Sequence, residues 1–322
     1  MSSNFLLLLQ KTLIYAIPLL IVALGGCFAE RSGIINLALE GEMIFGAFVG
    51  ALFVRICQLN GGFLVEHQQL LFVCALLVSG IFGGIFSLLL SFASIKLKAD
   101  QTIGGTALNM LAPALVLTLC LVFFNQEKLV MPKDLKYVIT NDELPFILKI
   151  FFDKAYLSTF VCVFIFIILS IWLYKSKIGM HMRACGEHPQ AANSVGINVF
   201  KMRYLGTTIS GFLAGIGGYA YIAAVAFGTA ESSVGGMGFL ALAIMIFGNW
   251  NPIGIALGSL LFGFLKCVGP LSLQMEFFKR LGLPIYFYNI LPYFIVIIVL
   301  IIFRKKSGCP KAEGQPYDKG QR

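Results

Sequence analysis

Polar side chains within otherwise apolar stretches are the first candidates for chemistry in this chain. The set is Asn36, Glu40, Glu42, Gln101, Thr106 and Asn109. These amides, carboxylates and hydroxyls suit hydrogen bonding to a neutral, hydroxyl-rich solute. Polar groups within apolar helices are costly and tend to face a cavity or a partner helix. We predict that the six residues line a solute pathway; alternatively, Glu40 and Glu42 cap a helix or pair with Arg31.

No residue pattern indicates catalysis or metal binding. The three histidines, His67, His181 and His188, lack ligand spacing, and the eight cysteines are scattered without a CxxC pair. The chain also has no Gly-x-x-x-x-Gly-Lys-Ser/Thr loop to hold phosphates. We therefore predict no catalytic residue, no metal site and no cofactor in this chain.

The polar stretch 175–203 is the second candidate for function. Pro189 suits the first position of a helix, and Gly196 suits the left-handed residue after a helix end. The predicted helix, 189–195, is too short to be stable alone. It is either a surface helix without a partner or a knob that docks into another protein. We favour docking.

Long runs without charge indicate the elements that position these residues. Of the 322 residues, 58% are hydrophobic and 12% are charged, about half the charged fraction of a soluble domain. A membrane crossing needs about 20 apolar residues. The uncharged candidate crossings are 68–95, 101–126, 155–174, 204–230, 232–265 and 281–303, and 12–29 and 38–54 are two further candidates. Because 232–265 is long enough for two crossings, we predict an all-α, polytopic membrane helical bundle of 8–10 segments, with 1–322 as a single domain.

The distribution of basic residues predicts the topology. Residues 304–322 hold six basic and two acidic groups, and 175–203 hold five and one, whereas 126–154 hold five of each. Basic excess marks the cytoplasmic side. We therefore place the loop 175–203 and the tail 304–322 in the cytoplasm and the loop 126–154 outside.

The stretch 30–42 has two interpretations. It holds four ionisable groups and two glycines between two apolar runs. It is either a cytoplasmic loop between two full helices or a broken, partly re-entrant segment lining a cavity, where irregular backbone is permitted at membrane depth. The two interpretations place the N-terminus on opposite sides, and we favour the broken segment.

Four stretches, together with the tail, carry a family resemblance. They read RACGEHPQAANSVGINVFKMRYLG (183–206), ERSGIINLALEGEMIFGAF (30–48), SIKLKADQTIGGTALNML (94–111) and GFLALAIMIFGNWNPIG (238–254), and the tail contains GQPYDK (314–319). The chain resembles the permease subunits of bacterial ATP-binding-cassette (ABC) importers, in the nucleoside and simple-sugar branch. That branch belongs to the superfamily of ribose and branched-chain amino-acid permeases. The resemblance covers nearly the whole chain in order.

The resemblance implies a multi-pass protein of the bacterial inner membrane. It implies two permeases on two cytoplasmic ATPases, which bind the ATP and Mg²⁺, and an extracytoplasmic binding protein or lipoprotein. The helix near 189–195 would fit a groove on the ATPase. The residues that the resemblance assigns to this coupling are Glu187, Pro189, Ala191, Ala192, Asn193 and Gly196. The branch favours a heterodimer of permeases and a nucleoside as solute, with a monosaccharide or a branched-chain amino acid as alternatives.

Two positions depart from the family pattern. Met237 stands between Gly236 and Gly238 where the branch usually has Arg, and Asn249 precedes the Trp-Asn-Pro turn where it usually has Lys. An ion-coupled secondary transporter is the rival class. It would need a carboxylate within the membrane. The spans between 68 and 303 contain almost none, because Asp100 lies at a helix start and Glu231 in an outer loop.

Overall fold

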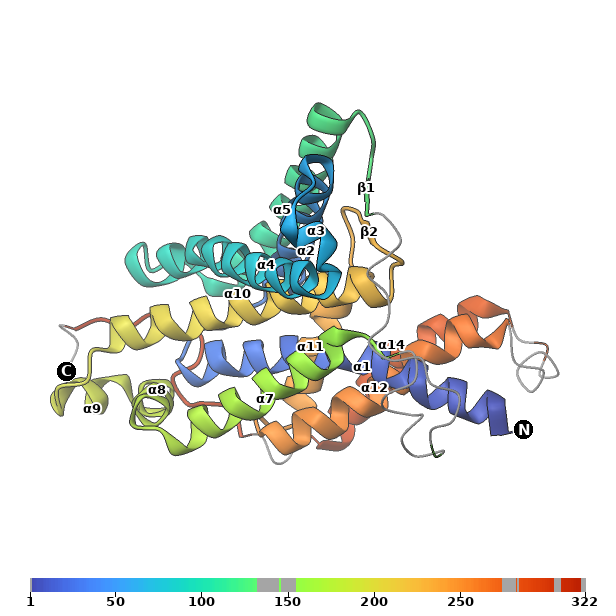
Figure 1. The fold of residues 1–322 in the computed structure, drawn as a ribbon. Helices are drawn as coiled ribbons and strands as arrows, with labels where there is room; N and C mark the ends of the chain where they lie inside the picture. The colour runs from blue at the N-terminus through green and yellow to red at the C-terminus, as the bar shows by residue number, and fades with distance from the viewer. Residues whose placement is uncertain are drawn as a thin grey trace.

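A computed structural model describes residues 2–131, 145, 155–273, 282, 284–303 and 308–319. These residues form the helical bundle that the sequence predicts (Figure 1). The helices are α1 (Ser2–Arg31), α2 (Leu39–Asn60), α3 (Phe63–Glu66), α4 (Gln68–Ser91), the π-helical turn η1 (Phe92–Lys96), α5 (Gln101–Phe124), α7 (Leu157–Lys175), α8 (Lys177–Glu187), α9 (Pro189–Ser194), α10 (Val199–Ala224), α11 (Met237–Phe247), α12 (Pro252–Ser272) and α14 (Ile285–Phe303).

Two short strands complete the described structure. The strands β1 (Leu129–Val130) and β2 (Thr229–Ala230) pair in antiparallel register, so that the chain after α5 contacts the chain after α10. Most of the predicted outer loop 126–154 lies outside the described residues, as do residues 304–307 and 320–322 of the predicted tail.

Six of the described helices are long and apolar enough to cross a membrane. They are Leu6–Arg31, Leu39–Asn60, Gln68–Lys96, Gln101–Phe124, Leu157–Lys175 and Pro252–Ser272. The helix α10 has 26 residues and a length of about 39 Å, which also suffices for a crossing. Shorter apolar helices, Met237–Phe247 and Ile285–Ile298, complete the set. The polytopic bundle and its helix positions are confirmed.

The helix α10 forms the centre of the bundle and packs against α1, α2 and α4. Small residues permit this close packing. A Cβ on Gly215 would overlap the backbone of Ser79 in α4, and a Cβ on Gly46 would meet the backbone of Gly215. Such approaches let helices contact through dispersion forces in lipid.

Local sequence explains where the helices begin. The Asp100 carboxylate accepts hydrogen bonds from the backbone N–H groups of Thr102 and Ile103 and so caps α5. The side chain of Asn251 accepts from the N–H of Ile253, and Pro252 occupies the first turn of α12. The predicted Trp-Asn-Pro turn between α11 and α12 is therefore confirmed.

Residues 32–38 form a non-helical connection, here called the joint, between α1 and α2. The predicted interruption of the helix is confirmed, and the structure combines features of both interpretations. As in the loop interpretation, α1 and α2 are each long enough to span, and the N-terminus lies at the end of the bundle opposite α8 and α9 (Figure 1). As in the broken-segment interpretation, the joint is enclosed: Ile34 and Asn36 have no exposed surface.

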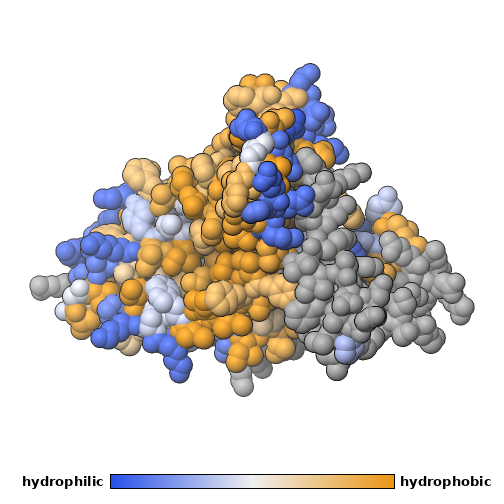
Figure 2. All heavy atoms as spheres, in the orientation of Figure 1, coloured by the Kyte–Doolittle hydropathy of each residue, from blue (hydrophilic) through white to orange (hydrophobic). Residues whose placement is uncertain are grey.

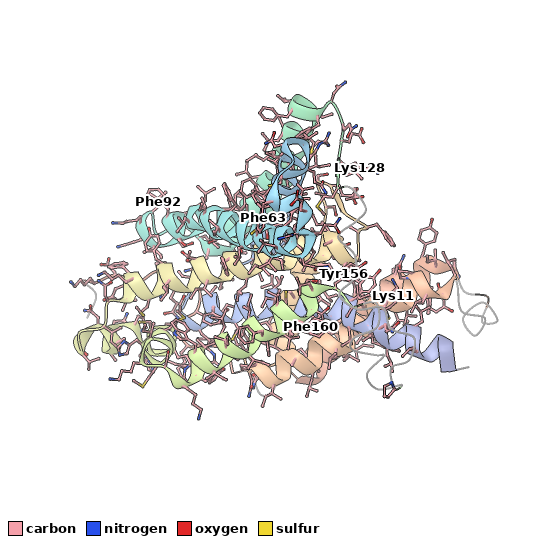
Figure 3. All side chains as sticks on the ribbon, viewed as in Figure 1. Lys11, Phe63, Phe92, Lys128, Tyr156 and Phe160 are labelled. Carbon is pink, nitrogen blue, oxygen red and sulfur yellow. The ribbon has the colours of Figure 1, made fainter. Side chains whose placement is uncertain are left out.

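The surface distinguishes the middle of the molecule from its α8–α9 end. Apolar residues cover most of the middle of this face, and hydrophilic residues gather over α8 and α9 and in a second patch over α2 and α3 (Figure 2). Phe63 of α3, before α4, and Phe92 of η1, directly after α4, are both exposed (Figure 3). Apolar rings at the surface suit a lipid environment, because the bilayer is as apolar as the side chains. We refer to the α8–α9 end as the cytoplasmic end, the side to which its basic excess assigns it.

Candidate functional site

The polar residues predicted to line a pathway gather around the joint and the start of α11. Glu40, Thr106 and Asn109 line one cavity of about 370 Å³, here called the asparagine cavity. Its other lining residues are Ile44, Met110, Pro113, Ser232, Ser233 and Phe239. The structure thus brings three of the six predicted residues to one cavity.

Glu40 caps α11. Its carboxylate accepts hydrogen bonds from the backbone N–H of Gly236 at 2.9 Å and from that of Gly238 at 2.6 Å. The first N–H groups of a helix have no partner within the helix and carry partial positive charge, so a carboxylate stabilises them. Gly238 also approaches Glu40 so closely that a Cβ there would overlap the backbone of Glu40. Two helices that begin within the bundle therefore meet at Glu40.

Asn36 and Glu42 lie behind this cavity without exposed surface. The Asn36 side-chain N–H₂ donates to both carboxylate oxygens of Glu42, at 3.0 and 3.1 Å, and to the hydroxyl of Ser210 at 2.9 Å. Its carbonyl oxygen accepts from the N–H of Ala38. The amide nitrogen of Asn36 therefore connects the joint to α2 and α10, and its carbonyl oxygen holds the backbone of the joint itself.

Gln101 and Asn109 tie α5 to the joint. The Gln101 carbonyl oxygen accepts from the N–H of Ile35 at 2.7 Å. Asn109 donates to the carbonyl of Leu37 at 2.6 Å and accepts from the N–H of Gly41 at 2.7 Å. These bonds satisfy backbone groups that the non-helical joint leaves without a helical partner.

The pathway role of the six residues stays a prediction, and the geometry adds a structural role for most of them. Thr106 donates to carbonyl oxygens of its own helix at Thr102 and Ile103, a common use of a hydroxyl in a helix. The alternative that Glu40 caps a helix matches its bonds, whereas Arg31 pairs with Glu187, at 3.7 Å, instead of with Glu40 or Glu42.

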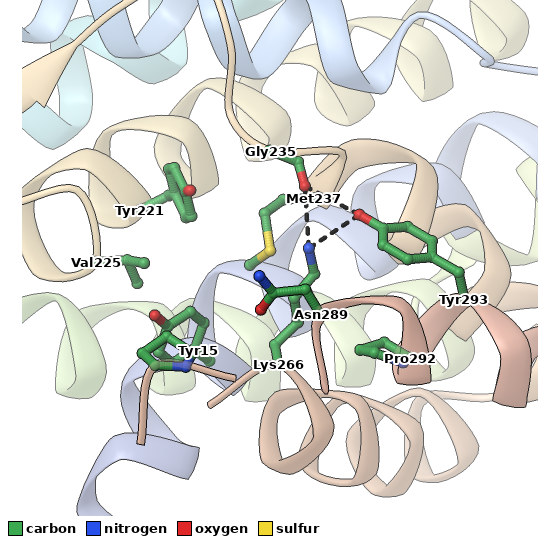
Figure 4. Close-up of a pocket in the computed structure, with 10 residues that line it drawn as sticks. Tyr15, Tyr221, Val225, Gly235, Met237, Lys266, Asn289, Pro292 and Tyr293 are labelled. Carbon is green, nitrogen blue, oxygen red and sulfur yellow. Dashed lines mark hydrogen bonds between the residues drawn. The ribbon is translucent and has the colours of Figure 1, made fainter. Parts of the chain in front are cut away.

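A second cavity, of about 330 Å³, lies on the other side of the α11 start and was not predicted from sequence (Figure 4). We call it the tyrosine cavity. Its lining residues are Tyr15, Tyr221, Val225, Gly235, Met237, Lys266, Pro270, Asn289, Pro292 and Tyr293. They come from α1, α10, α11, α12, α14 and the segment before α11.

Lys266 fixes one wall of the tyrosine cavity. Its ammonium donates to the carbonyl of Gly235 at 3.0 Å and to the hydroxyl of Tyr293 at 2.9 Å, and it lies 4.9 Å from the centre of the Tyr293 ring (Figure 4). The neighbouring Gly236 binds Glu40. The start of α11 is thus held by a carboxylate on one side and an ammonium on the other.

The remaining polar atoms of the tyrosine cavity are available to a solute. Within the described residues, no hydrogen bond joins the hydroxyls of Tyr15 and Tyr221 or the amide of Asn289 to another side chain or backbone group. Apolar walls with a few convergent polar groups are typical of small-molecule sites. The only sequence signal for this cavity was Lys266, the charge that ends the uncharged run 232–265.

The predicted docking helix is α9, and it presents one face outwards. Pro189 and Ala192 are buried, whereas Ala191, Ser194 and Val195 are exposed and Asn193 is half-buried. Gly196 follows with φ of +87° and is exposed. The helix and its left-handed end are therefore confirmed, and the docking role stays a prediction.

The inner face of α9 rests on a small apolar cluster. Ala192 packs with Cys185 of α8 and Val199 of α10, and with Tyr317 of the chain after α14. Burial raises the pKa of the Cys185 thiol to about 11, so it stays neutral and packs as an apolar group. Glu187, at the end of α8, is held by Arg31 at the end of α1.

The chain matches a known family and two full-length relatives. Residues 8–300 match the family described as the permease component of branched-chain amino acid transport systems. The chain is 37% identical to the guanosine ABC transporter permease protein NupQ of Bacillus subtilis over 319 residues, which cover 98% of both chains. It is 37% identical to the nucleoside ABC transporter permease protein NupC of Lactococcus lactis over 317 residues, again 98% of both.

A third relative comes from the same Lactococcus. The nucleoside ABC transporter permease protein NupB is 22% identical over 273 residues, which cover 79% of this chain and 70% of that protein. No solved structure matches the chain. The family match spans most of the sequence and agrees with the membrane bundle, so the chain belongs to the family of permease components of branched-chain amino acid transport systems.

Proposed function

We propose that the chain is the membrane-spanning permease of a bacterial ABC importer that moves nucleosides inward by alternating access. The observation that carries this proposal is the similarity, over 98% of the chain, to permeases of guanosine and nucleoside transporters. The geometry supports it, because the tyrosine cavity combines three aromatic rings with an amide and an ammonium. Tyrosine rings suit a flat heterocycle, and the free hydroxyls and amide suit the edges of a base or the hydroxyls of a ribose.

Uptake measurements test this proposal. We expect cells that carry the chain with its partner subunits to take up radiolabelled guanosine, and cells without the chain to lose that uptake. Unlabelled nucleosides should compete, whereas ribose and leucine should not. Competition by ribose or leucine alone would support the importer assignment but with a different solute. Unchanged uptake in cells without the chain would overturn the proposal.

Solute binding in the tyrosine cavity can be tested separately from the assignment of the chain as an importer subunit. We expect Asn289→Ala to raise the half-saturation concentration for guanosine about tenfold, because a hydrogen bond to a bound solute is lost. Tyr286→Phe is the matched control, because Tyr286 lies near the start of the same helix and is 75% exposed. An unchanged half-saturation concentration for Asn289→Ala would remove this cavity from the pathway.

The proposal places ATP hydrolysis and its Mg²⁺ on a separate cytoplasmic ATPase, with α9 as the docking element. The exposed face of α9 supports this role, because a short helix held from behind leaves its outer face for a partner. A cysteine introduced as Asn193→Cys should crosslink to the ATPase and react with reagents from the cytoplasmic side only. Reaction from outside in intact cells would contradict the topology.

We further propose that this permease pairs with a different permease and receives its solute from an extracytoplasmic binding protein or lipoprotein. Two nucleoside permease proteins of one Lactococcus both resemble this chain, at 37% and 22% identity, which supports a pair of related but unlike subunits. A tagged copy of the chain should therefore co-purify with the second permease. Recovery of an untagged second copy of this chain instead would favour a homodimer.

A further inference from the structure

The segment 308–319, here called the tail strap, folds back under the cytoplasmic end of the bundle instead of leaving it. It contacts the α10 start, the cluster beneath α9, the joint, the start of α5 and the turn before α12. A chain terminus usually remains poorly ordered unless specific contacts hold it. These contacts join elements that are distant in the sequence.

Tyr317 fixes the tail strap to the base of α9. Its side chain is 4% exposed and packs in the cluster that holds Ala192. Its ring lies 5.2 Å from the ring of Phe200, in an edge-to-face arrangement that aromatic pairs favour. A movement of α9 would therefore displace Tyr317, because Ala192 and Tyr317 pack in the same cluster.

Arg203 gives the tail strap a second attachment. This side chain is 1% exposed, and its Nη1 donates to the carbonyl of Gln315 at 2.9 Å. The guanidinium also lies 5.9 Å from the centre of the Tyr317 ring. Within the described residues no carboxylate pairs with Arg203, so the tail strap supplies its side-chain hydrogen bond. A buried guanidinium without such a partner is costly.

The other contacts of the tail strap reach the end of α8, the joint and the segment before α5. The N–H of Ala312 donates to the carbonyl of Gly186 at the end of α8, at 2.9 Å. Gly314, with φ of +74°, lies against Ile35 of the joint, so close that a Cβ would stand 2.8 Å from that side chain. Asp318 pairs with Lys98, just before α5, at 2.6 Å.

We infer that the tail strap is the mechanical link that transmits movement of α9 to the joint and to α5, with Tyr317 and Arg203 as positioning residues. This inference rests on the proposed function, because it takes α9 as the element on which the ATPase acts. The same chain of contacts ends at Ile35 and Lys98, next to Gln101 and Asn36, which anchor the joint. The strap therefore connects the docking helix to the residues around the asparagine cavity without passing along α10.

The test measures solute transported per ATP hydrolysed by the assembled complex in proteoliposomes. We expect Tyr317→Ala to lower this ratio about tenfold, within the range of coupling between distant sites, while assembly with the ATPase remains. Tyr317→Phe should keep the ratio, because the ring remains, and Tyr286→Ala should also keep it as a control at an exposed tyrosine. A ratio that is unchanged in Tyr317→Ala would overturn the inference, even if uptake and ATP hydrolysis both fall.

If Tyr317→Ala does not assemble with the ATPase, a second set of variants tests whether the tail strap transmits the movement. Lys98 and Asp318 are both about half exposed, so reversing their charges leaves the core intact. We expect Lys98→Asp and Asp318→Lys each to lower the ratio about twofold, as suits an exposed pair, and the double reversal to restore it. Equal ratios in all four proteins would overturn the inference. The ratio is measured with whichever solute the unaltered complex transports, so failure of the link and failure of the nucleoside assignment remain distinguishable.

Discussion

The joint and the short helix α9 both lie at the α8–α9 end of the bundle, but their polar groups have different surroundings. At the joint, side chains from α5 and from Asn36 bind the backbone, and the Ser210 hydroxyl of α10 accepts from the Asn36 amide. Asn36 and Glu42 have no exposed surface. At α9 only the inner face is packed, and Ala191, Ser194 and Val195 remain exposed. The difference teaches that polar residues in an apolar setting first satisfy the fold, whereas a short helix packed on one side keeps its other face exposed, as the predicted docking role requires.

The largest expected effect tests the enclosed side of this comparison. Asn36→Leu should reduce the free energy of unfolding by about 3 kcal/mol, because the Glu42 carboxylate and the Ser210 hydroxyl lose their buried partner. Thermal unfolding of the purified protein in detergent measures this loss. The matched control is Asn193→Leu on α9, which should unfold at nearly the wild-type temperature. Equal losses in the two variants would break the distinction between the regions.

The next prediction tests the partner-facing side. Gly196 has φ of +87°, and a Cβ there would meet no atom within 4 Å. Gly196→Val should therefore cost about 1–2 kcal/mol of local backbone strain without a steric clash. We expect uptake to fall about tenfold while the amount of folded protein in the membrane stays near that of wild type.

Gly196→Asn provides the control for that variant. Asparagine tolerates the left-handed conformation better than a β-branched residue, so uptake should largely survive. Normal uptake in Gly196→Val would show that the turn after α9 does not matter for docking.

Much of the fold could be predicted from sequence because its determinants are local. The uncharged run 101–126 gave α5, and Pro189 and Gly196 bracketed α9. The grouping of Glu40 with Asn109 was also predictable, because polar residues in apolar runs must find one another or a cavity. The hydrogen bonds of Glu40 and Asn109 to backbone groups could not be predicted, because these bonds depend on where the helix is interrupted.

The tyrosine cavity and the tail strap depend on contacts that no local pattern encodes. Tyr15 and Asn289 reach one cavity from helices near opposite ends of the chain. Arg203 and Gln315 are 112 residues apart. From sequence alone, a basic residue near a helix start indicates only which side of the membrane it lies on, because its buried partner is not known. The motif at 314–319 resembled the family pattern, but its sequence alone did not indicate that Tyr317 is buried beneath α9.

The smallest expected effect concerns Glu313, which lies between the two regions in the tail strap. Burial raises the pKa of its carboxyl above the usual range, and the hydrogen bond from the Cys309 thiol and the charge of Arg31 only partly oppose this. The folded protein therefore holds a proton at pH values where the unfolded chain has released it. Stability consequently falls as the pH rises from the usual pKa of Glu through the raised one.

Glu313→Gln should remove this pH dependence. Its amide oxygen still accepts from Cys309, and the cost of ionising a half-buried carboxyl disappears. We expect the variant to unfold at the same temperature as wild type at low pH, where Glu313 is protonated, and at a slightly higher temperature at pH 8. If the variant and the wild type differ in unfolding temperature by the same amount at both pH values, Glu313 is solvated like an exposed residue. The tail strap would then be looser at this position than at Tyr317, and the enclosed region of the molecule would end at the joint.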